Sequence, residues 1–197
     1  MKKWNHIGAI LAGGKSQRMG QPKEGIILWN DLPMIEHIIE TLLAICKKVV
    51  IIGEAKGYNN KKYNLKVIPD KSSYQGPLLG VETLLESSLD TEYLITACDQ
   101  PLLTPELLSD LTNDNTIADL KLFRTNPKDD INPFPGIYNV SLLPNIKESI
   151  QNNRFAMHLM IKECSNVSWI ELPNNSIHLL HNINTKEDLE KIKKLPL

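Results

Sequence analysis

The sequence has few cysteines, little net charge and no long apolar run, and each shortage excludes a class of protein. Its three cysteines, Cys46, Cys98 and Cys164, lie far apart and outside any C-x-x-C pattern. A disulfide framework or a zinc cluster is therefore not expected, and we expect all three to be small buried residues. The net charge of −1 gives no general footprint for nucleic acid. The apolar run near the N-terminus is too short for a signal peptide or a membrane span. We expect a cytoplasmic globular protein that binds neither nucleic acid nor membranes.

The pattern along the chain predicts one α/β domain that covers residues 1–197. A domain of this size buries about 70% of the surface that its unfolded chain exposes. β-branched apolar runs alternate with segments in which apolar residues recur at helical spacing. Strands are expected at residues 7–11, 48–53, 65–70, 93–99, 117–123 and 167–172, and helices at residues 33–43, 80–89, 105–111, 142–150, 155–162 and from 186. Residues 126–136 are expected to be irregular, and Thr185 with Asp188 resembles a capping box. This alternation predicts a doubly wound, mostly parallel sheet with helices on both faces.

The first strand ends in two glycines that cations follow, which predicts a phosphate-binding turn. Gly13 and Gly14 lack Cβ atoms, so their backbone N–H groups can approach an anion closely. Arg18 and Lys23 add full positive charges. The spacing fits neither a Walker A loop, because Ala9 stands where that loop needs glycine, nor the G-x-G-x-x-G pattern. The alternative is an ordinary strand-to-helix turn with surface cations.

Two aspartates follow apolar runs, where the carboxyl ends of parallel strands meet. Ligands of open α/β sheets bind at that edge. Asp70 and Asp99 could therefore converge beside the phosphate turn, and convergent carboxylates next to an anion site imply Mg²⁺. That ion prefers one or two carboxylates together with substrate phosphates and water. The alternative role for each aspartate is a helix cap or turn residue, and for Asp70 the two interpretations are evenly matched.

Five motifs together carry a resemblance to a known family. They are Leu11-Ala12-Gly13-Gly14-Lys15-Ser16-Gln17-Arg18-Met19-Gly20-Gln21-Pro22-Lys23, Pro69-Asp70, Gly76-Pro77-Leu78-Leu79-Gly80, Cys98-Asp99-Gln100-Pro101 and Asn182-Ile183-Asn184-Thr185-Lys186-Glu187-Asp188. The set resembles the molybdenum cofactor guanylyltransferase family and spans nearly the whole chain. The resemblance implies a sheet like that of glycosyltransferase-A and nucleotide-diphospho-sugar transferases, with a Rossmann-like winding. It also implies transfer of a GMP unit from GTP to the phosphate of molybdopterin, with release of pyrophosphate and a requirement for Mg²⁺.

The same resemblance implies roles for particular residues. The turn formed by Leu11, Ala12, Gly13 and Gly14 would contact GTP together with Lys23, and Arg18 would face the β and γ phosphates. Asp70 would lie near the nucleoside, and Asp99 would bind Mg²⁺. The base pocket would be lined by Gly76, Pro77, Leu78 and Gly80. Asn182 and Asn184, with Arg154 as a weaker candidate, would face the molybdopterin.

Three departures from the family pattern leave alternatives open. Residues 51–54 lack an asparagine that many relatives carry, residues 132–137 differ from the usual acceptor segment, and Pro22 replaces a frequent acidic residue. The alternatives are a nucleotidyltransferase that uses CTP, one that acts on a sugar or alditol phosphate, and a non-catalytic nucleotide-binding protein. We expect a monomer, with biosynthetic or cofactor-accepting proteins as possible partners.

The expected reaction needs no general base. A phosphate monoester has a second pKa of about 6, so the acceptor is mostly dianionic at neutral pH. The five histidines are scattered along the sequence, and we interpret them as structural residues, with His181 left open because it adjoins Asn182.

Overall fold

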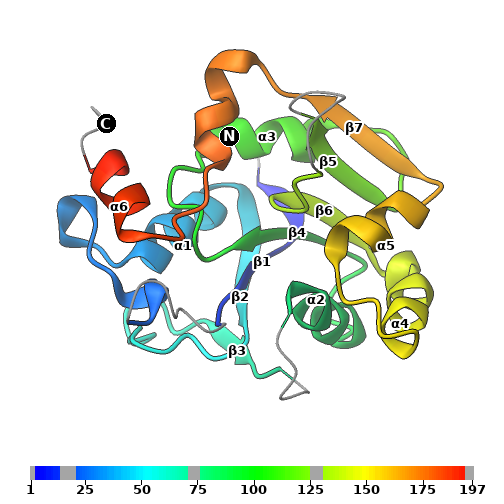
Figure 1. Cartoon of the computed structure of the whole chain (residues 1–197), viewed down its shortest axis with the longest axis horizontal. Helices are drawn as coiled ribbons and strands as arrows, with labels where there is room; N and C mark the ends of the chain where they lie inside the picture. Colours follow the sequence, from blue (N-terminus) through cyan, green and yellow to red (C-terminus); the bar gives the residue numbers. More distant parts are fainter. Residues whose placement is uncertain (1–2, 14–20, 71–75, 125–130, 194–197) are drawn as a thin grey trace.

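The computed structural model describes residues 3–13, 21–70, 76–124 and 131–193 (Figure 1). Within these residues one sheet has the strand order β3-β2-β1-β4-β6-β5-β7. The strands are β1 (Trp4–Leu11), β2 (Cys46–Ile52), β3 (Lys66–Ile68), β4 (Glu92–Ala97), β5 (Leu120–Arg124), β6 (Gly136–Asn139) and β7 (Val167–Glu171). The α-helices are α1 (Met34–Ile45), α2 (Pro77–Glu86), α3 (Pro105–Asn113), α4 (Leu143–Gln151), α5 (Met157–Glu163) and α6 (Lys186–Ile192). Short 3₁₀ turns are η1 (Lys23–Gly25), η2 (Trp29–Asp31), η3 (Val140–Leu142) and η4 (Asn174–Leu180).

The sheet is mostly parallel, as predicted. β1 lies between β2 and β4 and is parallel to both. β3 is parallel to β2, and β7 is parallel to β5. β6 is antiparallel to both of its neighbours, β4 and β5. The carboxyl ends of β1, β2, β3 and β4 therefore point toward one edge of the sheet.

Helices cover both faces of the sheet, which confirms the doubly wound arrangement. The core on one face contains α1 and α3, and the core on the other contains α2, α4 and α5. Side chains alternate along β1, so that Ile10 belongs to the first core and Ala9 to the second. α1 buries Ile35, Ile38 and Leu42 at helical spacing. Burial of such a side chain stabilises the fold by about 1.5–3 kcal/mol.

The structure corrects two expectations about the later strands. β5 begins at Leu120 instead of residue 117, and Ile117 is 94% exposed. β6 was not expected, because its four residues follow a proline-rich stretch and carry no clear alternation. Gly136 permits its close pairing, since a Cβ there would stand 2.5 Å from Leu122 Cδ2. Tertiary pairing with β4 and β5 therefore decides that this segment is a strand.

Several smaller expectations can also be compared with the structure. The capping box of Thr185 and Asp188 at the start of α6 is confirmed. Cys46 and Cys98 are buried as expected, whereas Cys164 is only half-buried beside α5. Across the described ranges, no helix is both long and apolar enough to span a membrane.

Candidate active site

The ends of β1, β2, β3 and β4 form the floor of the candidate site. Backbone hydrogen bonds continue beyond the strands: Cys98 N donates to Leu11 O at 3.0 Å, Ala12 N to Ile52 O at 2.8 Å, and Gly53 N to Ile68 O at 2.8 Å. Gly13 after β1, Asp70 after β3 and Asp99 after β4 consequently lie along the same edge. The sequence predicted this shared edge, and the convergence of the two aspartates on one ligand stays a prediction.

Lys23 joins two of the other predicted residues. Its Nζ donates to Asp99 Oδ2 at 3.1 Å and to Asn184 Oδ1 at 2.6 Å. The side chains of Lys23 and Asp99 are each 15% exposed, so water screens this pair only partly. Ile183 N donates to Asp99 O at 2.8 Å, which fixes the C-terminal motif against the end of β4. Three motifs far apart in sequence therefore meet at one ammonium group.

The second oxygen of Asp99 is suited to a cation. Oδ1 is buried and has no hydrogen-bond partner among the described residues, while Oδ2 receives Lys23. A buried carboxylate oxygen without a partner is costly, so a ligand at this position would be favourable. No group of three or more His, Cys, Asp or Glu residues able to hold a metal occurs in the described part of the chain. The donor set fits a cation held by one carboxylate and completed by substrate oxygens and water.

Asp70 stands between two glycines. Its Oδ2 is 3.2 Å from where a Cβ of Gly53 would stand, and its Oδ1 is 3.7 Å from the corresponding point of Gly80. Partial burial of the carboxyl, together with the nearby charge of Glu54, raises the pKa of Asp70 above its usual value. The residue as a whole is exposed, so it is open to solvent in spite of the partial burial of its carboxyl.

Residues 76–80 lie at the start of α2, with their side chains in different settings. Pro77 is exposed, and a Cβ added to Gly76 would meet no described atom within 4 Å. Leu78 is fully buried in the core, so its side chain is not accessible to a ligand. A Cβ on Gly80 would stand 3.2 Å from Leu11 Cδ2, so glycine there permits α2 to pack closely against β1.

Some predicted residues are not part of the joined cluster. Gly14 and Arg18 lie outside the described residues. Asn182 is exposed beside Ile183 and accessible to a ligand. Arg154 forms an ion pair with Glu163. The structure therefore unites Lys23, Asp99 and Asn184 and leaves Arg154 engaged elsewhere.

Two residues to which the sequence assigned no role support this edge. Glu24 is 2% exposed, and its Oε1 accepts the backbone N–H of Gly13 at 2.8 Å. Gln100 is fully buried, and its Nε2 donates to Phe134 O at 2.8 Å and to Leu180 O at 3.4 Å. In sequence, both resemble surface residues beside a functional one. Only burial distinguishes them, and burial is not visible in a motif.

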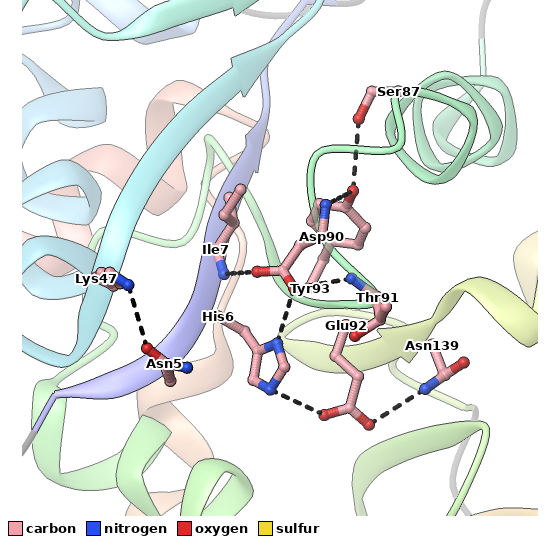
Figure 2. Close-up of polar contacts among 10 residues, drawn as sticks. All are labelled: Asn5, His6, Ile7, Lys47, Ser87, Asp90, Thr91, Glu92, Tyr93 and Asn139. Carbon is pink, nitrogen blue, oxygen red and sulfur yellow. Dashed lines mark hydrogen bonds and ion pairs between the residues drawn. The ribbon is translucent and has the colours of Figure 1, made fainter.

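His6 lies at the opposite end of β1 and has a structural role. Its Nδ1 is 2.9 Å from Asp90 Oδ1, and its Nε2 is 3.8 Å from Glu92 Oε2 (Figure 2). Asp90 Oδ2 also accepts from Ile7 N at 3.1 Å, and Asp90 N donates to Tyr93 Oη at 2.7 Å (Figure 2). This cluster fixes the amino ends of β1 and β4, far along the strands from Asp99.

Comparison with known proteins places the chain in a family. A family model described as a MobA-like NTP transferase domain matches residues 8–166. A protein of Flavobacterium johnsoniae named "probable molybdenum cofactor guanylyltransferase" is 38% identical over 186 residues, covering 93% of this chain and 94% of that protein. A protein of the same name from Carboxydothermus hydrogenoformans is 33% identical, over 95% and 94% of the two chains.

Solved structures agree in fold. Molybdopterin-guanine dinucleotide biosynthesis protein A from Archaeoglobus fulgidus superposes with a TM-score of 0.79 at 20% identity, over 96% of this chain and 97% of that one. A nucleotidyl transferase from Methanothermobacter superposes with a TM-score of 0.75 at 16% identity, over 95% of each chain. These likenesses confirm the predicted fold class. With the domain match over residues 8–166 and relatives above 30% identity along nearly the whole length, the chain belongs to the MobA-like NTP transferase family, among the molybdenum cofactor guanylyltransferases.

Proposed function

We propose that this chain, as a single nucleotidyltransferase domain, transfers the GMP unit of GTP to the phosphate of the molybdenum (molybdopterin) cofactor and releases pyrophosphate. The names of its relatives support this reaction. The observation that carries it is the contact of Lys23 Nζ with Asp99 at 3.1 Å and with Asn184 at 2.6 Å. That contact brings the predicted nucleotide, metal and acceptor residues to one point.

The reaction requires charge stabilisation and positioning more than proton transfer. An oxygen of the acceptor phosphate forms a bond to the α-phosphorus of GTP, and the bond from that phosphorus to pyrophosphate breaks. The acceptor is mostly dianionic at neutral pH, because its second pKa is about 6, so no side chain must remove a proton. Lys23 supplies a fixed positive charge for the developing negative charge on phosphate oxygens. We propose Arg18 and the glycine turn as further contacts to the triphosphate, except for the N–H of Gly13, which donates to Glu24.

Asp99 is the residue that would hold Mg²⁺, through the buried oxygen that lacks a partner among the described residues. When bound there, Mg²⁺ supplies charge neutralisation at the triphosphate. Lys23 remains on the other oxygen of Asp99 and keeps the carboxylate oriented. In this proposal the carboxylate uses one oxygen for Lys23 and the other for the cation.

The remaining residues divide between the two substrates. Asp70 and the start of α2, including Gly76, lie on the β3 side of Asp99 and are proposed to contact the nucleoside. Asn182, which is exposed, is proposed to contact the molybdopterin. Asn184 lies where the two sides meet, because it accepts from the nucleotide lysine. We further propose that the protein acts as a monomer in the cytoplasm, which gel filtration and cell fractionation would test.

The function can be tested by binding and then by turnover. Thermal shift with GTP, CTP, ATP and UTP in the presence of Mg²⁺ should show the largest stabilisation by GTP. Pyrophosphate release should then depend on both GTP and loaded molybdenum cofactor. A larger shift with CTP would indicate a cytidylyl transferase, and binding without pyrophosphate release would indicate a non-catalytic homologue. Near-normal turnover by Asp99→Ala would contradict the proposed role of Asp99.

A further inference from the structure

Glu24 is an acidic residue buried beside a site that is expected to bind an anion. Its side chain is almost entirely enclosed, with 2% exposure. Its Oε1 accepts the backbone N–H of Gly13 at 2.8 Å. Gly13 has φ of +107°, a conformation that residues with a Cβ rarely adopt. The carboxylate therefore holds Gly13, two residues beyond the last residue of β1.

The neighbours of Glu24 in the chain are fixed by different parts of the site. Lys23 reaches Asp99 and Asn184. Gly25 packs on Gly57 so closely that a Cβ would stand 2.4 Å from Gly57 O. Residues 23–25 thus contact three separate parts of the structure. Glu24 supplies the contact with Gly13.

A carboxylate at this position must have a role that offsets the cost of burying it. A buried charged group is unfavourable unless hydrogen bonds satisfy it, and a hydrogen bond to a charged acceptor is stronger than a neutral one. While Gly13 N–H donates to Glu24, that group is not directed at a substrate phosphate. The bond instead sets where the turn lies relative to the ammonium of Lys23.

We propose that Glu24 is a positioning residue for nucleotide binding: its carboxylate anchors Gly13 so that the glycine turn and Lys23 engage one triphosphate together. It acts through Gly13 and Lys23 and does not itself touch the substrate. Because the ligand is GTP, the proposal rests on the proposed function. If the glycine turn or Lys23 is displaced by about 1 Å, binding and catalysis that depend on preorganised contacts become weaker.

Three substitutions of Glu24 separate the effect of side-chain length from the effect of the negative charge. Glu24→Gln keeps an oxygen that can accept from Gly13 N–H but makes the bond neutral, so its KM for GTP should rise by much less than that of the other two variants. Glu24→Asp keeps the charge but is one methylene shorter, and Glu24→Ala removes the acceptor. Both should raise the KM for GTP about tenfold, the size of effect expected for a lost hydrogen bond to a charged group, with a smaller change in kcat.

Glu36→Ala is the matched control. Glu36 lies on α1 and is also buried, at 7% exposure. It forms an ion pair with Lys62 at 2.7 Å. Its removal should lower the melting temperature without changing the KM for GTP, which distinguishes positioning from general destabilisation. Amide exchange of Gly13, followed by NMR without nucleotide, should accelerate in Glu24→Asp and Glu24→Ala and stay slow in Glu24→Gln.

Two results would overturn the proposal. One is an unchanged GTP affinity and Gly13 exchange rate in both Glu24→Asp and Glu24→Ala. The other is an equal rise in KM for Glu24→Gln and Glu24→Ala, which would show that the anchoring bond is not what matters. Failure of the wild-type protein to bind any nucleotide would instead overturn the proposed function itself, so the two failures are distinguishable.

Discussion

The contact between Lys23 and Asp99 predicts coupled effects on stability and turnover. At 3.1 Å and an effective dielectric constant of about 20, the two charges attract by about 5 kcal/mol before desolvation is counted. Partial burial of both groups offsets much of this, so we expect a net coupling of about 1–3 kcal/mol. Lys23→Met and Asp99→Asn should each destabilise the fold, and the double variant should be less destabilised than the sum of the two.

Urea unfolding of the wild type, the two single variants and the double variant measures this coupling. The matched control is the pair of Lys56 and Glu54, which lie 2.9 Å apart with side chains 73% and 70% exposed, and for which we expect no measurable coupling. Turnover, followed by pyrophosphate release, should fall by about 10²- to 10³-fold in each single variant at the site. Additive effects of Lys23→Met and Asp99→Asn on stability would refute the reasoning, since the two side chains would then not interact in solution.

Three further predictions follow from other parts of the structure. Asn184→Ala should weaken both GTP binding and use of the acceptor, because Asn184 accepts from Lys23. Asn182→Ala should weaken only use of the acceptor. Separate titrations of the two substrates check this, and an unchanged GTP affinity in Asn184→Ala would contradict it. Burial and Glu54 raise the pKa of Asp70 above 3.8, so the folded state binds that proton more tightly than the unfolded chain, and stability from this group is lost as the pH rises through the raised pKa. Asp70→Asn should therefore raise the melting temperature at pH 7 and weaken GTP binding, and a lower melting temperature would count against it. Asp90→Ala should lower the free energy of unfolding by about 1–3 kcal/mol, because the hydrogen bonds of Asp90 with His6 and Ile7 are lost. Turnover should be unchanged, because these residues lie at the opposite end of β1. A large loss of turnover would show that they influence the site.

Much of the fold was predictable because its signals are local. The apolar runs of β1, β2 and β4 and the helical spacing in α1 depend on neighbours within a few residues. The capping box of Thr185 and Asp188 likewise depends only on four consecutive positions. β6 was missed because its backbone partners, β4 and β5, are distant in sequence, and its four residues carry too short a pattern.

The candidate site was predictable in part for the same reason. Strand ends in a parallel sheet share one edge, so the convergence of Asp99 with the turn after β1 followed from the order of elements. The pairing of Lys23 with Asn184 did not follow, because 161 positions separate them and no periodicity relates them. Glu24 and Gln100 were missed since their types are usually exposed, and nothing nearby in sequence records that they are enclosed.

The sequence by itself determined the alternation of strands and helices, because this depends on spacing within short segments, and its motifs carried the resemblance to a nucleotidyltransferase family. Only the tertiary structure decided which oxygen of Asp99 receives Lys23 and which is buried without a hydrogen-bond partner among the described residues. It also decided that Glu24 faces inward to hold Gly13. These outcomes depend on packing between segments far apart in the chain, where burial changes the cost of leaving each polar atom without a partner.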